Sequence, residues 1–240
     1  MRRIIGPGRA GILLLGTALF VTACGSHHGN SLPTLGSAAT PPPTVTAAPF
    51  ADSATLQAKL LTAADMPSGF TRIDDGSGGN GQTPPDRSHT DPAACAKVLD
   101  GVTKQVPGAS AAGAVHYSSP DFDSVDIDAA SYPNSAAAQA FSTVEDLVRR
   151  CTSYSGTDAD GTAVSYRIGG LSEPKAGDAS ISFQVQTSSQ GLTLYSAATL
   201  ALVGSTIVQI ARAAQKPVDP AALRDLTDAQ IRRLQGISGP

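Results

Sequence analysis

The chain has no tryptophan, and aromatic residues make up only 5% of its 240 residues. Charged residues are also few, at 15%, and the net charge is −3 with the histidines neutral. Nucleic-acid-binding proteins typically carry a strongly basic surface with interleaved aromatic side chains. The composition therefore argues against nucleic acid as a partner, and against electrostatic attachment to anionic lipid.

Sequence motifs typical of catalytic sites are also missing. The sequence has no GxSxG nucleophile motif, no CxxC pair, and no glycine-rich phosphate loop after an expected strand. Of the four histidines, only His89 and His116 fall in the part expected to fold. His116 lies in an expected strand, and the favoured interpretation is a histidine on the sheet surface; the alternative is a general base. The sequence thus favours a protein that is not an enzyme, with no cofactor and no metal site.

The densest acidic group is Asp121, Asp123, Asp126 and Asp128. Close carboxylates can bind calcium or act as an acid/base pair. The run DFDSVDID lacks the glycine and glutamate that the EF-hand loop requires, and Val125 stands where an oxygen ligand belongs. A solvated strand face is therefore the favoured interpretation.

The first 23 residues have the pattern of an export signal. Arg2, Arg3 and Arg9 precede an apolar run over residues 11–20, which is too short for a membrane span. Val21-Thr22-Ala23-Cys24 then resembles the lipobox of bacterial lipoproteins, which implies a mature protein that begins at a lipidated Cys24, with acyl chains such as palmitate. The alternative is an ordinary signal peptide followed by a chance cysteine.

Removal of residues 1–23 lowers the basic count from 17 to 14 against 20 acidic residues, so the mature chain is more acidic still. Residues 24–51 are rich in Pro, Ala, Ser and Thr, with almost no charge and no apolar period. Such a segment is expected to be a flexible tether. His27 and His28 within it are expected to be solvated. The tether leads to one domain over residues 52–237.

Two cysteines remain once Cys24 is assigned to lipid. Cys95 and Cys151 both lie on expected apolar stripes, in a compartment that permits disulfides. The favoured prediction is a disulfide between Cys95 and Cys151, and the alternative is two separately buried thiols.

Hydrophobic periodicity predicts an α+β fold. A short helix begins at Asp52 or Ser53, a strand follows at 70–73, and Asp91-Pro92 opens a helix with Cys95, Val98, Leu99 and Val102 on its buried stripe. Further elements are paired strands at 114–118 and 125–132, a helix from Asn134 or Ser135 to Cys151, four strands over 163–213, and a last helix from Asp219-Pro220 that a capping box at Thr227 divides in two. Gly191 and Gly204 fall at expected hairpin turns, so we expect a twisted antiparallel sheet with helices packed on it. The loop 74–90 is expected to be variable surface, with a flap over a site as the alternative.

Three stretches resemble a known family: LLTAADMP, then YPNSAAAQAF before a helix that ends in a cysteine, and the late hairpin GLTLYSAATLALVGSTIVQIARAA. Together they resemble the extracellular sensor domain of PknH-type mycobacterial kinases and the lipoproteins that share it, over roughly residues 56–234. The resemblance implies an antiparallel sheet flanked by helices, with a cleft for an unknown ligand. Kinase members have a second cysteine pair near the last hairpin, and residues 195–214 contain none.

Three functions stay open. The favoured one is a lipid-anchored lipoprotein of the mycobacterial envelope, on the extracytoplasmic face of the cell membrane, whose sensor-like domain binds an unknown ligand. A structural lipoprotein that binds an envelope protein is the second, and a hydrolase with an unusual site is the third. No ligand-binding residue is identified from the sequence.

Overall fold

The computed structural model describes residues 31–43, 47–73, 87–133 and 136–237. The chain divides into two units, Met1–Ser31 and Leu32–Pro240, and the described helices and strands all belong to the second. The expected signal peptide, Cys24, His27, His28 and residues 74–86 lie outside the described residues. No helix in the described ranges is long and apolar enough to cross a membrane.

The elements follow one another in the order of an α+β domain. The helices are α1 (Ser53–Gln57), η1 (Ala63–Asp65), η2 (Ala93–Leu99), α2 (Val102–Gln105), α3 (Ala136–Arg150) and α4 (Pro220–Leu234). The strands are β1 (Thr71–Ile73), β2 (His89–Asp91), β3 (Ala111–Ser118), β4 (Ser124–Ser131), β5 (Ser153–Thr157), β6 (Ala163–Gly170), β7 (Ala179–Ser189), β8 (Leu192–Val203) and β9 (Thr206–Ala214).

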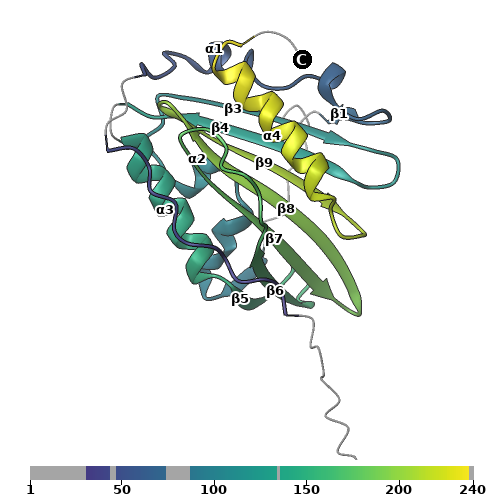
Figure 1. Cartoon of the computed structure of the whole chain (residues 1–240). Helices are drawn as coiled ribbons and strands as arrows, with labels where there is room; N and C mark the ends of the chain where they lie inside the picture. The colour runs from purple at the N-terminus through teal and green to yellow at the C-terminus, as the bar shows by residue number, and fades with distance from the viewer. Residues whose placement is uncertain (1–30, 44–46, 74–86, 134–135, 238–240) are drawn as a thin grey trace, which may run out of the picture. The chain divides into compact units, whose positions relative to one another are not determined.

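The strands form one antiparallel sheet of nine strands in the order β1-β3-β4-β9-β8-β7-β6-β5-β2 (Figure 1). This confirms the predicted fold class. Gly191 and Gly204 have φ of 82° and 57° in the turns that flank β8. A side chain at these positions would strain the backbone, so glycine is what lets β7, β8 and β9 follow one another as hairpins.

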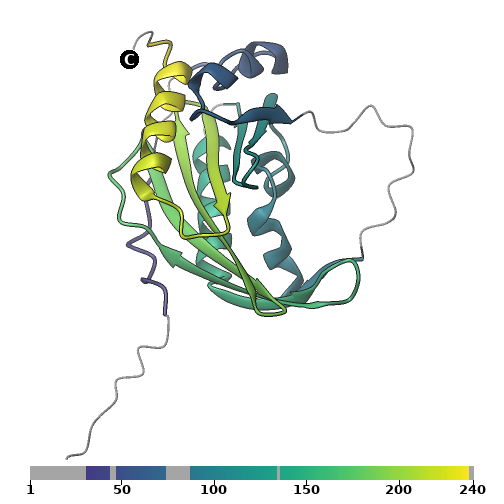
Figure 2. The same ribbon diagram turned by 90° about the vertical axis from the view of Figure 1, so that its right-hand side faces the viewer.

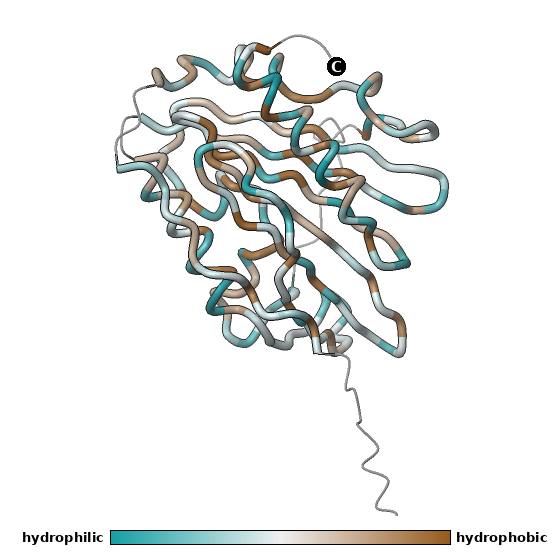
Figure 3. Tube along the Cα trace, viewed as in Figure 1, coloured by the Kyte–Doolittle hydropathy of each residue, from teal (hydrophilic) through white to brown (hydrophobic). Residues whose placement is uncertain are grey.

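Each face of the sheet has its own core, with helices on both sides (Figure 2). Val125, Ile127 and Ile210 pack with α1 and α4 on one face, and the alternate residues of the same strands face α3 on the other. Brown, hydrophobic stretches therefore follow the central strands in Figure 3. We call the side that packs on α3 the α3 face.

The disulfide prediction is confirmed, because Cys95 and Cys151 are joined with a Cα–Cα distance of 5.6 Å. Both cysteines are only 2% exposed. The bond ties η2 to the end of α3, and so fixes the segment between Cys95 and α2 over the sheet.

Two helix predictions are wrong in detail. The segment after Pro92 is a 3-10 helix in which Leu99 is 52% exposed, not buried. The helix after Asp219 is continuous, because Gln230 does not cap a new helix: its side-chain oxygen accepts from Leu61 N at 2.9 Å, and its nitrogen donates to Lys59 O at 3.0 Å.

The predicted tether also differs from the structure. Residues 32–43 run beside α3 (Figure 1), where Gly170 N donates to Pro33 O at 2.8 Å and Ala39 N donates to Glu145 Oε1 at 2.8 Å. Residues 47–51 continue along the domain, and Phe50 N donates to Ser131 Oγ at 3.0 Å. A β-carbon at Gly169 would collide with Leu32, so glycine permits this close approach. We call residues 32–43 the strap.

The sheet edges are short or covered. The edge strands β1 and β2 have three residues each. Beyond β1, the edge of β3 binds side chains from the α1 helix: Ser53 Oγ accepts from Ala112 N at 3.0 Å, and Gln57 both accepts from Ala114 N and donates to Ala114 O, each at 3.0 Å. Few main-chain groups of the described strands are therefore left open at the edges.

Candidate functional site

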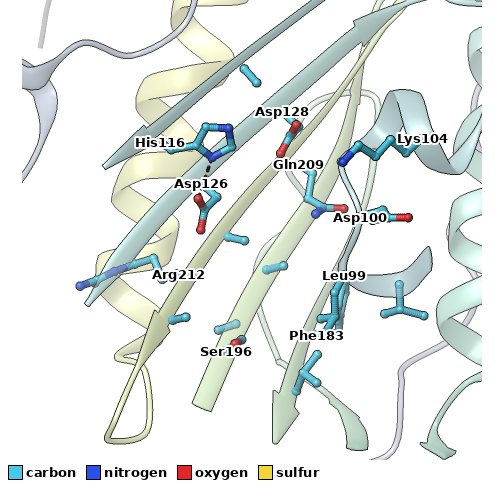
Figure 4. Close-up of a pocket in the computed structure, with 18 of the residues that line it drawn as sticks. Leu99, Asp100, Lys104, His116, Asp126, Asp128, Phe183, Ser196, Gln209 and Arg212 are labelled. Atoms are coloured by element: carbon cyan, nitrogen blue, oxygen red, sulfur yellow. Dashed lines mark hydrogen bonds and ion pairs between the residues drawn. The ribbon is translucent and has the colours of Figure 1, made fainter. Parts of the chain in front are cut away.

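A cleft of about 690 Å³ opens on the α3 face of the sheet, where α3 does not cover it (Figure 4). Residues 98–104, from the end of η2 into α2, form one wall. Strands β3, β4, β9, β8 and β7 form the floor and the opposite wall. The disulfide therefore holds one wall of the cleft in place.

Small side chains make this hollow. Ser196 and Ala198 on β8 stand opposite Ala213 and Ala211 on β9. Further along the same strands and on the same face, Leu200, Leu202 and Ile207 are fully buried in the core on which α3 packs. The strands continue through both regions, so the volume of the side chains, not the course of the backbone, leaves the space.

One side of the cleft is polar. His116 on β3 and Asp126 on β4 are register partners, and His116 Nδ1 lies 2.8 Å from Asp126 Oδ1. Ser124 Oγ donates to the other carboxylate oxygen, Oδ2, at 3.0 Å. Histidine and serine thus bind the same carboxylate, which is not the Ser-His-Asp order that activates a serine nucleophile.

Asp128 is the next residue of β4 on the same face, and it lies against the chain at Gly101. A β-carbon at Gly101 would collide with the Asp128 carboxylate. Glycine is therefore required for the wall to approach β4 this closely. Asp128 also borders a second hollow, of about 410 Å³, lined by Gln57, Arg72 and Thr103, so the polar side extends toward the β1 edge.

A buried amide pair supports the floor. Gln209 on β9 is 7% exposed, and its Oε1 accepts from Gln105 Nε2 at 3.3 Å. The same nitrogen donates to Asp100 O at 2.6 Å, while Gln105 Oε1 is buried without a partner among the described residues. These contacts link α2 to the sheet beneath the cleft.

The other side of the cleft is apolar. Phe183 and Val185 on β7 are buried, and Leu99 from η2 stands over them with half of its surface exposed. Beyond them, Tyr154 and Tyr166 stack with ring centroids 4.5 Å apart. Burial raises the pKa of Tyr154, whose hydroxyl has no partner in the described part of the chain.

The acidic residues of the sequence separate into two groups. Asp126 and Asp128 line the cleft and are not on a plain solvated face as expected. Asp121 and Asp123 lie in the β3–β4 turn, where both backbone amides bind Ser119 Oγ. No group of three His, Cys, Asp or Glu among the described residues has the arrangement of a metal site.

The two histidines of the domain also separate. His116 lies in the cleft, whereas His89 is in edge strand β2 with Nδ1 2.9 Å from Thr157 Oγ1. Sequence patterns do not single out Leu99, Lys104, Phe183 or Gln209 as site residues. The spacing of Leu99 predicts a core position, and the others have no motif around them.

Fold and cleft together define an α+β domain built on one open antiparallel sheet, with a cleft of mixed polarity on one face. The chain belongs to the PknH-like extracellular domain family, whose model matches residues 51–232.

Two solved structures are similar to the chain. The extracellular domain of PknH from Mycobacterium tuberculosis matches with a TM-score of 0.53 and 12% identity, over 74% of this chain and 94% of that one. An uncharacterized protein from Mycobacterium smegmatis matches with a TM-score of 0.39 and 16% identity, over 72% and 92% of the two chains. No curated protein matches the chain. At such identities the first structure supports the fold alone.

Proposed function

We propose that this chain is a lipid-anchored, extracytoplasmic lipoprotein of the mycobacterial type whose domain binds a small ligand in the cleft without chemical turnover. Family membership and the disulfide support a location outside the cytoplasm. The signal-like segment and the lipobox ending in Cys24 support the anchor. The resemblance of the sequence to the extracellular sensor domain of PknH-type kinases suggests a sensor-like role.

The proposal of ligand binding rests on the cleft. Small-molecule sites usually enclose about 300–1,000 Å³, with apolar walls and a few convergent polar groups. The cleft has about 690 Å³, with Phe183, Val185 and Leu99 on one side and His116, Asp126 and Asp128 on the other. A site of this volume and polarity suits ligand binding, and its His-Asp pair has no aligned nucleophile among the residues described.

The test is to produce the full chain in a mycobacterial host and examine it by native mass spectrometry. We expect a bound small molecule on the natural protein and none on Ala211→Leu, which fills the floor of the cleft. Ala163→Leu is the matched control, because Ala163 is exposed on β6 outside the cleft, and it should keep the molecule. A bound mass that survives Ala211→Leu, or no bound mass at all, contradicts ligand binding in the cleft.

The anchor has a separate test. Cys24→Ala should move the protein from the membrane fraction to the soluble fraction and remove the mass of the acyl chains. Membrane recovery that is unchanged in Cys24→Ala would contradict lipidation at this residue.

An interaction with an envelope protein is the second candidate, and Phe122 is the observation that favours it. This side chain is 79% exposed at the β3–β4 turn and has φ of 64°, which is unusual for a bulky residue. Crosslinking from position 122 in intact cells should capture one envelope protein if this candidate holds.

A further inference from the structure

The cleft divides its polar and apolar groups between two sides. His116, Asp126 and Asp128 stand together on β3 and β4, while Phe183 and Leu99 stand together at the other side (Figure 4). Lys104 reaches toward Asp128 and Gln209 from the wall. A ligand that fills this cleft must therefore carry a polar end and an apolar end.

The apolar side continues beyond the cleft along β8. Successive residues of a strand alternate between faces, so Leu192 and Leu194 share the face of Ser196 and Ala198. Leu194 stands opposite Thr187, the next residue on the cleft face of β7 after Val185. Leu192 and Leu194 are 77% and 42% exposed. Together with Leu99 they are three of the six large hydrophobic residues exposed in the described part of the chain.

We call Leu99, Leu194 and Leu192 the leucine track. It leads from the apolar end of the cleft along β8 toward the β7–β8 turn. An apolar chain that lay along the track would remove these side chains from water, which is favourable in proportion to the area covered.

The polar side carries both signs of charge. Asp126 and Asp128 offer carboxylate oxygens, whereas Lys104 and the amide nitrogen of Gln209 are donors. Arg212 also borders the cleft, but its register partner is Val125, so strand alternation directs its side chain to the opposite face of the sheet. A head group with a full charge would meet a like charge here. Hydroxyl groups both donate and accept, so a neutral polyhydroxyl head suits every one of these groups.

We propose that the ligand is an amphiphile, with a neutral hydroxyl-rich head between His116, Asp128 and Lys104 and an apolar chain along the leucine track. This inference rests on the proposed function, because it names the class of ligand for the same cleft.

The test compares probes that share a chain or a head. Dodecyl maltoside, maltose, dodecylamine and dodecanoate are titrated into the natural protein, the three dodecyl compounds below their micellar concentrations, and heats of binding are measured. We expect dodecyl maltoside to bind at least 10-fold more tightly than each of the other three. Maltose that binds equally well would remove the leucine track from the proposal, and dodecylamine or dodecanoate that binds equally well would overturn the neutral head.

Variants then assign the contacts. The double variant Leu192→Ser/Leu194→Ser should weaken the binding of dodecyl maltoside about 10-fold. It should leave the free energy of unfolding nearly unchanged, since both side chains are exposed. Ile237→Ser is the matched control, because Ile237 is 54% exposed but lies after α4, outside the track. Equal weakening in the control, or none in the double variant, overturns the inference.

Failure of this inference is distinguishable from failure of the proposed function. If Ala211→Leu removes the molecule bound in the host while dodecyl maltoside does not bind, the cleft is a ligand site for another class of compound. If Ala211→Leu removes nothing, the cleft itself is not the site.

Discussion

The two ends of the α3 face are built on the same strands but differ in the size of their side chains. At one end Leu200, Leu202 and Ile207 are fully buried in the core beneath α3. At the other end, Ser196, Ala198 and Ala211 leave the cleft open beside residues 98–104. One strand can therefore stabilise the fold at one end and line an open cleft at the other, while its backbone continues through both regions. We call these the covered end and the open end.

Loss of the disulfide should have the largest effect on stability, because the bond joins α3, which packs on the covered end, to η2, which leads into the cleft wall at the open end. On the chain-entropy model, a loop of the 56-residue separation between Cys95 and Cys151 corresponds to about 4 kcal/mol. Cys95→Ser/Cys151→Ser should lower the free energy of unfolding by about that amount in urea titrations and release the cleft wall. A midpoint unchanged from that of the natural protein would show that packing alone holds η2 on α3.

Truncation at the covered end should come next. Leu200→Ala removes a side chain that is 0% exposed, and such changes cost about 2–5 kcal/mol because the cavity only partly collapses. Urea unfolding with an unchanged slope is the measurement. A cost below about 1 kcal/mol would mean that the covered end is packed no more tightly than the open end.

The same enlargement at both ends tests the comparison directly. Ala130→Leu, at a fully buried position in the α3 core, should cost about 1–3 kcal/mol through overpacking. Ala211→Leu projects into the cleft, and its effect on stability should stay within about 0.5 kcal/mol. Equal costs for the two variants would contradict an open, solvent-accessible cleft.

Among the changes at the covered end, loosening the strap should have the smallest effect, because the strap is an outer layer there. Glu145, only 3% exposed in its side chain, accepts from Arg149 at 2.7 Å and from Ala39 N, and Arg149 Nη1 donates to Gly36 O at 2.8 Å. Arg149→Met should cost about 1–2 kcal/mol, because it removes charge-assisted hydrogen bonds from the Glu145 carboxylate, which among the described residues keeps only the hydrogen bond from Ala39 N. Hydrogen exchange at Ala39 should become faster.

Arg150→Met is the control for the strap, since Arg150 is exposed at the next position of α3. Its exchange at Ala39 should match that of the natural protein. Slow exchange at Ala39 in Arg149→Met would show that the strap is held by other contacts.

Much of this fold can be predicted from local hydrophobic patterns in the sequence. The apolar stripe of α3, from Ala140 to Val148, is buried as the 3.6-residue period predicts. The alternation of Val125, Ile127 and Ala129 places them in the core of the opposite face. These elements were predictable because burial repeats with the period of the structure.

Other features depend on contacts that no local pattern records. The strap has the composition of a disordered linker, and its order comes from hydrogen bonds to Glu145 and Arg149, more than a hundred residues away in sequence. The strands β2 and β5 are short and largely polar, and they pair with one another at the edge of the sheet.

The sequence does not predict the cleft, for a related reason. Alanine is compatible with both buried and exposed strand positions, so Ala198 and Ala211 carry no sign of an empty volume above them. Leu99 fitted the spacing of a helical stripe, but the 3-10 turn of η2 places it over the cleft. Only the tertiary arrangement shows which apolar residues remain in contact with water.

The short, covered edges of the sheet matter if the protein is held on a membrane surface, as we propose. Open strand edges recruit strands from neighbouring molecules, and this is the route to aggregation of many β proteins. Here the three-residue strands β1 and β2 offer few groups for such pairing, and Gln57 and Ser53 occupy the next section of β3. Crowded copies are therefore expected to stay separate, each with its own cleft open to solvent.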